Sequence, residues 1–232
     1  MTAMRRVDRQ ELLDTGAGTA AEIQQSLLDL RRINRRYGGI RTTRILLARV
    51  AAASGRKQMS VLDIAAGSGD VVAGAARELA KTGLCIEPTF LDQSAEHLAN
   101  APGARRLVGD ALALPFADNS FDVATCSLFL HHLDPEKVTV FATEALRVAR
   151  IALVVNDLVR SRLHLAMIYL GQPSFSRITR HDSIASVRRA YTLGEARDMV
   201  ARSGAPIARI ETFTHFLFRI GLIAWKQPTS MI

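Results

Sequence analysis

The chain has 232 residues, 48% of them apolar, which is enough for the core of one domain with an addition and argues against disorder. The apolar runs are too short to span a membrane, and the charged N-terminus lacks the apolar stretch of a secretory signal, so we expect a cytoplasmic protein. The net charge of +8 comes mostly from scattered arginines. We interpret it as a solvated surface, and leave open a transient contact with an anionic membrane surface.

Helical and strand patterns follow one another along the chain. Two helices are predicted first, at 20–37 and 42–53. Short apolar strands then alternate with helices of about 10–15 residues, which is typical of a doubly wound, mostly parallel α/β sheet. The strands are predicted at 60–64, 84–91, 105–108, 121–127, 151–156, 207–212 and 216–225, and the later helices at 70–81, 94–101, 136–149, 162–170 and 193–203. Ligands of such sheets bind beyond the carboxyl ends of the strands, so site residues are expected there.

A glycine-rich turn after the first of these strands is the strongest local signal, running from Asp63 through Gly67-Ser-Gly69 to Asp70. Glycines let the backbone approach a ligand closely. A dinucleotide site would need a third glycine where Val72 stands, and a carboxylate at the start of the helix disfavours phosphate. S-adenosylmethionine carries no phosphate but has an ammonium and a sulfonium, which suit an acidic strand end. The alternative is a purely structural turn.

Two more acidic residues follow the next two strands. Asp92 ends the second strand, where a carboxylate can accept hydrogen bonds from ribose hydroxyls. Asp110 follows the third strand, and its carboxylate can accept from an adenine amino group while the Ala111 N–H donates to a ring nitrogen. The alternative for Asp110 is that it caps the turn that follows.

Taken together, these motifs resemble the class I S-adenosylmethionine-dependent methyltransferases, from about residue 59 to residue 225. The likeness is strongest to the ubiquinone and menaquinone biosynthesis branch, and extends to bacterial methyltransferases associated with type III polyketide pathways. It implies a Rossmann-like sheet of seven strands in the order 3-2-1-4-5-7-6, the last strand antiparallel. It also implies S-adenosyl-L-methionine as cofactor, and the cofactor-binding residues that we predict are Asp63, Ala65, Gly67, Gly69, Asp92, Gln93, Asp110, Ala111 and Ser127.

The acceptor side is less well defined by the sequence. His131 and His132 follow the fourth strand and are candidate catalytic bases for a phenol or enol acceptor; the alternative is that they fix the loop. No metal site is predicted. The candidate acceptor contacts are His132, Asn156, His181, Arg188 and Tyr191.

We divide the chain into an N-terminal helical cap at 1–57 and a cofactor-binding domain at 58–232, whose insertion at about 158–192 covers the acceptor pocket.

The predicted function is O- or C-methylation of a small acceptor that is lipophilic and aromatic, quinone-like or polyketide. One alternative is an RNA or protein methyltransferase that uses its basic surface, although no nucleic-acid partner is expected because no RNA-binding module is visible. Another is a non-catalytic cofactor-binding protein. The oligomeric state is left open.

The two cysteines, Cys85 and Cys126, lie in apolar strand-like runs and are predicted to be small buried thiols. In the implied strand order, strand one separates them, which places them ~9.6 Å apart. A disulfide needs Cα atoms within ~7 Å, so we predict two free thiols.

Overall fold

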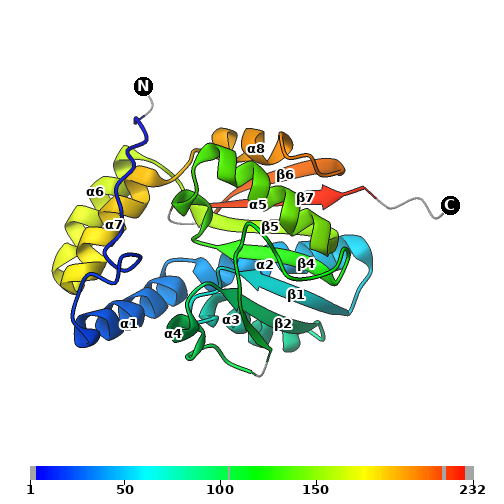
Figure 1. The fold of residues 1–232 in the computed structure, drawn as a ribbon, viewed down its shortest axis with the longest axis horizontal. Coiled ribbons are helices and arrows are strands. Elements are labelled where there is room, and N and C mark those ends of the chain that lie inside the picture. Colours follow the sequence, from blue (N-terminus) through cyan, green and yellow to red (C-terminus); the bar gives the residue numbers. More distant parts are fainter. Residues whose placement is uncertain (1–3, 104, 216–217, 228–232) are drawn as a thin grey trace.

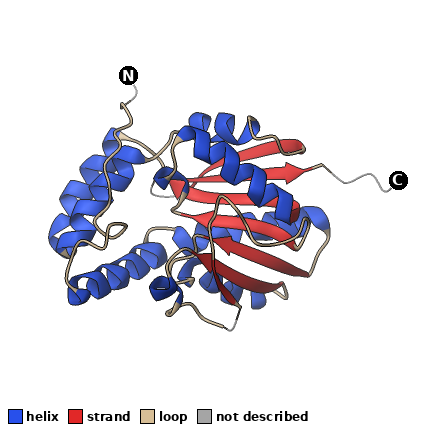
Figure 2. Ribbon diagram, viewed as in Figure 1, coloured by secondary structure: helices blue, strands red, loops and turns tan. Residues whose placement is uncertain are grey.

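The computed structural model describes residues 4–103, 105–215 and 218–227. Within them, seven strands form one sheet in the order β3-β2-β1-β4-β5-β7-β6 (Figures 1 and 2). Strand β7 is antiparallel to both of its neighbours, and the other pairs are parallel. The predicted α/β sheet and its strand order are therefore confirmed. The strands are β1 (Gln58–Ile64), β2 (Cys85–Asp92), β3 (Arg106–Val108), β4 (Phe121–Ser127), β5 (Ala149–Leu158), β6 (Ile207–His215) and β7 (Arg219–Lys226).

Helices cover both faces of this sheet, and a further group stands beside it (Figure 1). One face packs against α2 and α3, and the other against α5 and α8. Helices α1, α6 and α7 form the group at the side, and α1 and α6 each contact α7. The helices are α1 (Ala20–Arg36), α2 (Gly39–Ser54), α3 (Asp70–Ala80), α4 (Ala95–Leu98), α5 (Pro135–Val148), α6 (Arg162–Gly171), α7 (Arg177–Arg189) and α8 (Leu193–Ala201), with single 3₁₀ turns η1 (Leu130–His132) and η2 (Gln172–Ser174).

The local sequence explains where these elements begin and why they are buried. Thr19 and Glu22 form a reciprocal capping box at the start of α1, and Pro135 occupies the first turn of α5. The middle of β5, from Ala152 to Val155, is buried on both faces, as expected for a central strand between two helix layers. None of the described helices is long and apolar enough to cross a membrane.

The structure differs from the sequence-based expectations in three elements. Helix α2 packs into the sheet core through Leu46, Leu47 and Val50, so the two helices of the predicted cap at 1–57 lie in different parts of the fold. Helix α7 was not predicted as a helix, because its sequence is rich in polar and basic residues. Helix α4 is only four residues long and therefore shorter than predicted.

Both cysteines are free thiols, as predicted, but only one of them is buried. Cys126 lies in the middle of β4 and is fully enclosed. Cys85 is exposed, so the prediction of a buried thiol there was wrong. It is the first residue of β2 and precedes the buried Ile86, and successive side chains of a strand point to opposite faces.

Candidate active site

The carboxyl ends of β1 and β4 lie side by side at the centre of the sheet, and each is followed by a strained residue. Ala65 follows β1 with φ of 55°, and Leu128 follows β4 with φ of 57°. Side chains with a Cβ seldom adopt this left-handed conformation, which costs about 1–3 kcal/mol and is concentrated at functional sites. The chain therefore bends sharply at the strand ends where this fold class binds its ligands.

The predicted glycine turn connects β1 to α3. The N–H of Gly67 donates a hydrogen bond of 2.8 Å to Oδ2 of Asp92. Gly69 is the N-cap of α3 with φ of 65°, and a Cβ there would lie 2.9 Å from the Phe90 ring. Only glycine combines this φ with so close an approach to Phe90.

Three carboxylates, those of Asp63, Asp70 and Asp92, interact electrostatically around this turn. Asp63 is buried, and its Oδ1 has no hydrogen-bond partner among the described residues. Burial, together with the charges of Asp70 and Asp92, holds the pKa of Asp63 well above its usual range. This end of the sheet therefore favours a bound cation, which fits the ammonium and sulfonium of S-adenosylmethionine.

The next two predicted cofactor contacts, Asp92 and Asp110, are partly used by the protein itself. The Oδ1 of Asp92 accepts a hydrogen bond of 2.9 Å from the N–H of Ser94, in addition to the bond from Gly67. The Oδ1 of Asp110 accepts one of 2.8 Å from the N–H of Leu112, which is the capping role considered as its alternative. A carboxylate has about four acceptor positions, so both residues retain capacity for ribose and adenine groups.

One cavity of about 830 Å³ brings these residues together. All of the predicted cofactor residues line it except Gly69, whose contribution is the shape of the turn. Helices α1, α6 and α7 also line it, on the acceptor side. The cavity therefore has a polar half at the strand ends, which we call the cofactor half, and a half covered by these helices, which we call the acceptor half.

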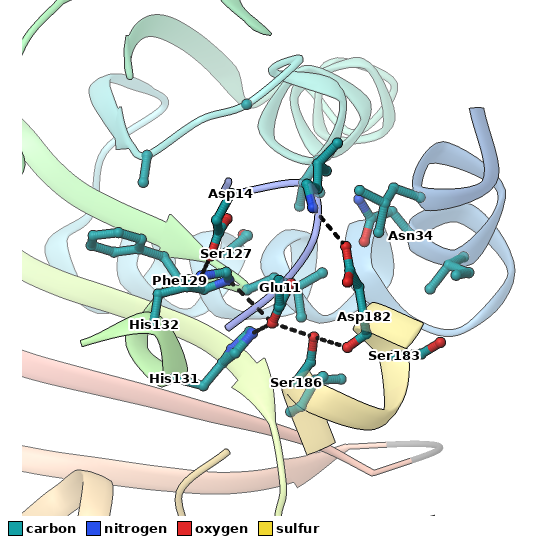
Figure 3. A pocket seen from close by; sticks show the side chains of 18 of the residues that line it. Glu11, Asp14, Asn34, Ser127, Phe129, His131, His132, Asp182, Ser183 and Ser186 are labelled. Carbon is teal, nitrogen blue, oxygen red and sulfur yellow. Dashed lines mark hydrogen bonds and ion pairs between the residues drawn. The ribbon is translucent and has the colours of Figure 1, made fainter. Parts of the chain in front are cut away.

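Residues 4–17, which we call the N-terminal strap, lie along α7 and reach into the acceptor half (Figures 1 and 3). The N–H groups of Leu12 and Leu13 donate to the two carboxylate oxygens of Asp182, at 2.8 and 3.0 Å. The N–H of Val7 donates to the carbonyl oxygen of Arg188 at 3.1 Å. These bonds hold the strap in place, and it carries Glu11 and Asp14 to the cavity wall.

His131 lies between two carboxylates. Its Nδ1 is 2.7 Å from Oδ1 of Asp157, and its Nε2 is 3.5 Å from Oε1 of Glu11 (Figure 3). Burial alone would lower the pKa of His131, but Asp157 and Glu11 raise it to about 10. Burial alone would likewise raise the pKa of Glu11, but His131, His132 and Ser186 lower it to about 2. The His131 ring thus lies between two carboxylates whose charges favour its protonated form.

His132 is arranged in a similar way but is more accessible, with 22% of its side chain exposed. Its Nδ1 lies 2.8 Å from Oδ2 of Asp14, and its Nε2 lies 3.8 Å from Oε1 of Glu11. The ring stacks on Phe129 at a centroid distance of 6.4 Å. Both histidines thus present Nε2 to the same carboxylate oxygen.

Of the five predicted acceptor contacts, only His132 lines the cavity. The Nδ2 of Asn156 donates to the Gly39 carbonyl and to Thr43 Oγ1, both at 2.9 Å, so it holds α2 against the sheet. The Tyr191 hydroxyl donates to the Leu133 carbonyl at 2.6 Å. His181 contacts the neighbouring Asp182, and Arg188 lies against Tyr169, so neither reaches the cavity wall.

Several residues of the cavity wall were not predicted. Glu11 and Asp14 come from a stretch of the N-terminus that has no recognisable pattern, and no local signal points to them. Arg219, at the start of β7, is also at the wall; its Nη1 is buried and has no partner among the described residues. Its other nitrogens reach the Tyr37 carbonyl at 3.2 Å and Asn34 Oδ1 at 3.4 Å.

Comparison with known proteins agrees with this geometry. Residues 61–151 match the family described as a methyltransferase domain. The chain is 38% identical over 105 residues to the ubiquinone/menaquinone biosynthesis C-methyltransferase of Dinoroseobacter shibae, covering 41% of this chain and 40% of that protein. It is 32% identical over 82 residues to the demethylmenaquinone methyltransferase of Staphylococcus aureus, with 34% of each chain covered. The matched segments thus span between a third and two fifths of these relatives.

Solved structures extend the likeness of the fold over most of the chain. The plantazolicin methyltransferase BamL, in complex with a triazolic desmethylPZN analogue and SAH, superposes with a TM-score of 0.67 at 15% identity, covering 89% of this chain and 91% of that one. A SAM-dependent methyltransferase from Aquifex aeolicus gives a TM-score of 0.59 at 16% identity, covering 89% and 98%.

Fold and sequence agree on a class: residues 61–151 match a methyltransferase domain, and the sheet that contains them has the strand order that the resemblance to the class I S-adenosylmethionine-dependent methyltransferases implies. Within that class, its sequence is similar to the branch that includes the quinone-biosynthesis enzymes.

Proposed function

We propose that this protein transfers a methyl group from S-adenosylmethionine to a small, lipophilic acceptor that is aromatic, quinone-like or polyketide. The observation that carries the proposal is the cavity of about 830 Å³, which joins an acidic cofactor half to a covered acceptor half. Pockets for small ligands commonly measure about 300–1,000 Å³. The relatives are named for menaquinone and ubiquinone biosynthesis, and BamL binds a triazolic desmethylPZN analogue; these are molecules with conjugated rings, which supports this acceptor class.

The cofactor half contributes orientation and charge. In this proposal Asp92 and Asp110, which line the cavity, accept hydrogen bonds from the nucleoside, and Asp63 favours the positively charged methionine end. S-adenosylmethionine supplies a methyl group that is already activated on a sulfonium. The protein therefore needs chiefly to align the acceptor with this group and to exclude water.

Apolar side chains line much of the acceptor half. They include Leu27, Leu30 and Ile33 of α1, and Met167 and Ile168 of α6. The strap and α7 cover the same side and are joined by hydrogen bonds. A covered apolar pocket favours a small molecule over RNA or a protein side chain, because a macromolecule needs an open surface around the reacting group.

His132 is the more suitable of the two predicted bases. It lines the acceptor half, and 22% of its side chain is exposed, whereas His131 is 2% exposed and lies between Asp157 and Glu11. Asp14 orients the His132 ring through Nδ1, which directs Nε2 toward the cavity. A base is required only where the acceptor carries an acidic hydroxyl or an enol.

A transient contact with an anionic membrane remains part of the proposal, because a lipophilic acceptor would reside there. Leu163, Met167 and Leu170 of α6 are exposed, and Met167 and Leu170 also line the cavity. Cosedimentation with vesicles containing anionic lipid, compared with neutral vesicles, measures this contact. Equal recovery with both vesicle types would contradict it.

Calorimetry and a transfer assay test the proposal. The purified chain should bind S-adenosylmethionine, and Asp92→Asn should weaken binding about ten-fold or more, because charge-assisted hydrogen bonds contribute about 1.5–3 kcal/mol. Asp198→Asn, an exposed acidic position on α8 away from the cavity, is the matched control and should bind as the native chain does. No binding at millimolar cofactor would overturn the proposal.

The acceptor class is tested separately with labelled cofactor and a panel of hydroxyquinones, phenols and acyl pyrones, analysed by mass spectrometry. Methylation of at least one lipophilic member is expected. A gel shift with RNA at physiological salt tests the alternative. RNA binding together with inactivity on the whole panel would favour that alternative.

A further inference from the structure

Glu11, His131 and His132 form a cluster in the acceptor half, which we call the Glu-His cluster (Figure 3). The nitrogen and oxygen atoms that they offer lie within 4.8 Å of one another. Nε2 of His131 is 3.5 Å from Glu11 Oε1, and Nε2 of His132 is 3.8 Å from the same atom. These separations are long for hydrogen bonds. They are close to the ~3.4 Å between two ligand atoms of a tetrahedral ion with bonds of about 2.1 Å.

The outer nitrogens of both rings are held by carboxylates. Nδ1 of His131 lies 2.7 Å from Asp157, and Nδ1 of His132 lies 2.8 Å from Asp14. Metal-binding histidines in proteins typically donate their second ring N–H to a carboxylate or carbonyl, which directs the other nitrogen at the metal. Asp157 comes from β5 and Asp14 from the strap, so two separate segments orient the two rings toward one point.

We propose that the Glu-His cluster binds one divalent transition-metal ion, with Zn²⁺ as the best fit. Two imidazoles and one carboxylate form a donor set used for zinc and non-haem iron, whereas magnesium and calcium prefer oxygen ligands alone. Three protein ligands leave one further coordination position in a tetrahedral site, and two when zinc expands to five ligands. Because Glu11 and His132 line the acceptor half, these positions face the acceptor.

The open coordination positions of the ion indicate which acceptors the site would select, and this inference about the acceptor rests on the proposed function. An acceptor with two neighbouring oxygen atoms, as in a catechol or a hydroxyquinone, would bind the ion through those atoms. The ion lowers the pKa of a bound hydroxyl, whose proton passes to bulk water. In the metal-bound protein, Nε2 of His132 is a ligand, so the ion takes over the activation otherwise expected from a histidine base.

Metal binding is measured on the tag-free full chain after treatment with a chelator. We expect one equivalent of Zn²⁺ per chain by elemental analysis after gel filtration, and saturable binding of Co²⁺ with the visible absorption of a low-coordinate site. Mg²⁺ at the same concentration should not compete. Absence of stoichiometric Zn²⁺ and Co²⁺ binding would show that the cluster is an ion-pair network, and would overturn the inference.

Variants locate the ion. Glu11→Gln keeps the size of the side chain but removes its charge and should abolish stoichiometric binding, and Asp14→Asn should weaken binding about 10- to 100-fold. His97→Ala is the matched control, because His97 also lines the cavity and lies 3.8 Å from a carboxylate, that of Asp92, but belongs to no such cluster. It should keep full metal affinity. Equal binding by Glu11→Gln and the native chain would contradict the assignment.

Calorimetry with S-adenosylmethionine on the same samples separates this inference from the proposed function. Cofactor binding retained in Glu11→Gln shows that this variant is folded, so its loss of metal is informative. Metal bound without any cofactor affinity would refute the methyltransferase proposal and leave the metal site standing. With Co²⁺ bound, catechol should change the visible spectrum; an unchanged spectrum would refute the part concerning the acceptor.

Discussion

Replacing Asp63 by asparagine should make the unliganded protein more stable and its cofactor binding weaker. The Asp63 carboxylate is fully buried, one of its oxygens lacks a partner among the described residues, and Asp70 and Asp92 repel it. A neutral amide of the same size removes this repelled buried charge, and leaving such a group uncompensated costs about 1–3 kcal/mol. Asn should therefore stabilise the fold at pH 8 by about 1–3 kcal/mol, which raises the melting temperature by roughly 2–12 °C for a chain of this size.

The same substitution removes the charge that we expect to face the cofactor. Losing a charge-assisted hydrogen bond costs about 1.5–3 kcal/mol, so the affinity for S-adenosylmethionine should fall about 10- to 150-fold. Denaturant unfolding and calorimetry measure the two effects on one preparation. Asp122→Asn is the matched control, because Asp122 is a buried carboxylate at the amino end of β4 that accepts from the Ser60 N–H at 2.9 Å. The Asp122→Asn variant should lose about 1–2 kcal/mol of stability and keep the cofactor affinity of the native chain.

The pH dependence has a definite sign. The pKa of Asp63 is raised on folding, so above its usual value of 3.8 the unfolded chain releases a proton that the folded chain retains. The stability of the native protein therefore falls, relative to that of Asp63→Asn, as pH rises above about 4. The two proteins should be nearly equal in stability below that pH. If Asp63→Asn loses stability as Asp122→Asn does, or binds the cofactor as tightly as the native chain, the assigned role of the Asp63 charge is refuted.

Two further predictions concern the cysteines and the glycine turn. A thiol reagent should modify only Cys85 in the folded protein and both cysteines after denaturation, because burial raises the pKa of Cys126 and encloses its sulfur; two rapid modifications in the folded state would contradict this. Gly69→Ala should cost about 2–5 kcal/mol in unfolding measurements, from backbone strain of about 1–2 kcal/mol plus overlap with Phe90 of about 1–3 kcal/mol. Gly55→Ala has the same backbone conformation but open space around it, so it should cost only the strain. Equal losses in the two variants would show that the contact with Phe90 is unimportant.

The cofactor half could be predicted from the sequence because its signals are local. Asp63, Gly67 and Gly69 lie within seven consecutive residues, and the parallel sheet brings Asp92 and Asp110 to the same edge without further information. The strands could also be predicted from local sequence, because central strands such as β5 are apolar on both faces and form short apolar runs. The residues of this half that the sequence predicted line one cavity in the structure, and their individual roles remain predictions.

The acceptor half could not be predicted, because it depends on contacts between distant segments. Glu11 meets His131 across 120 positions of sequence, and nothing around Glu11 indicates such a partner. Tyr191 was a reasonable candidate as an aromatic residue in a basic stretch, yet its hydroxyl bonds to the Leu133 carbonyl. Two adjacent histidines are not a recognisable metal-binding spacing, so the arrangement with Glu11 emerges only in three dimensions.

The dependence of α7 on the strap has a consequence for engineering the acceptor preference. Asp182 is a buried carboxylate whose two oxygens are both occupied by N–H groups of Leu12 and Leu13, 170 and 169 positions away. Grafting α7 from a relative without its own strap would remove both N–H donors and leave that carboxylate with only the neighbouring His181 ring, at a cost of about 1–3 kcal/mol. A chimera that is meant to accept a new substrate must therefore exchange both segments together, while the strand ends that hold the nucleoside can be left untouched.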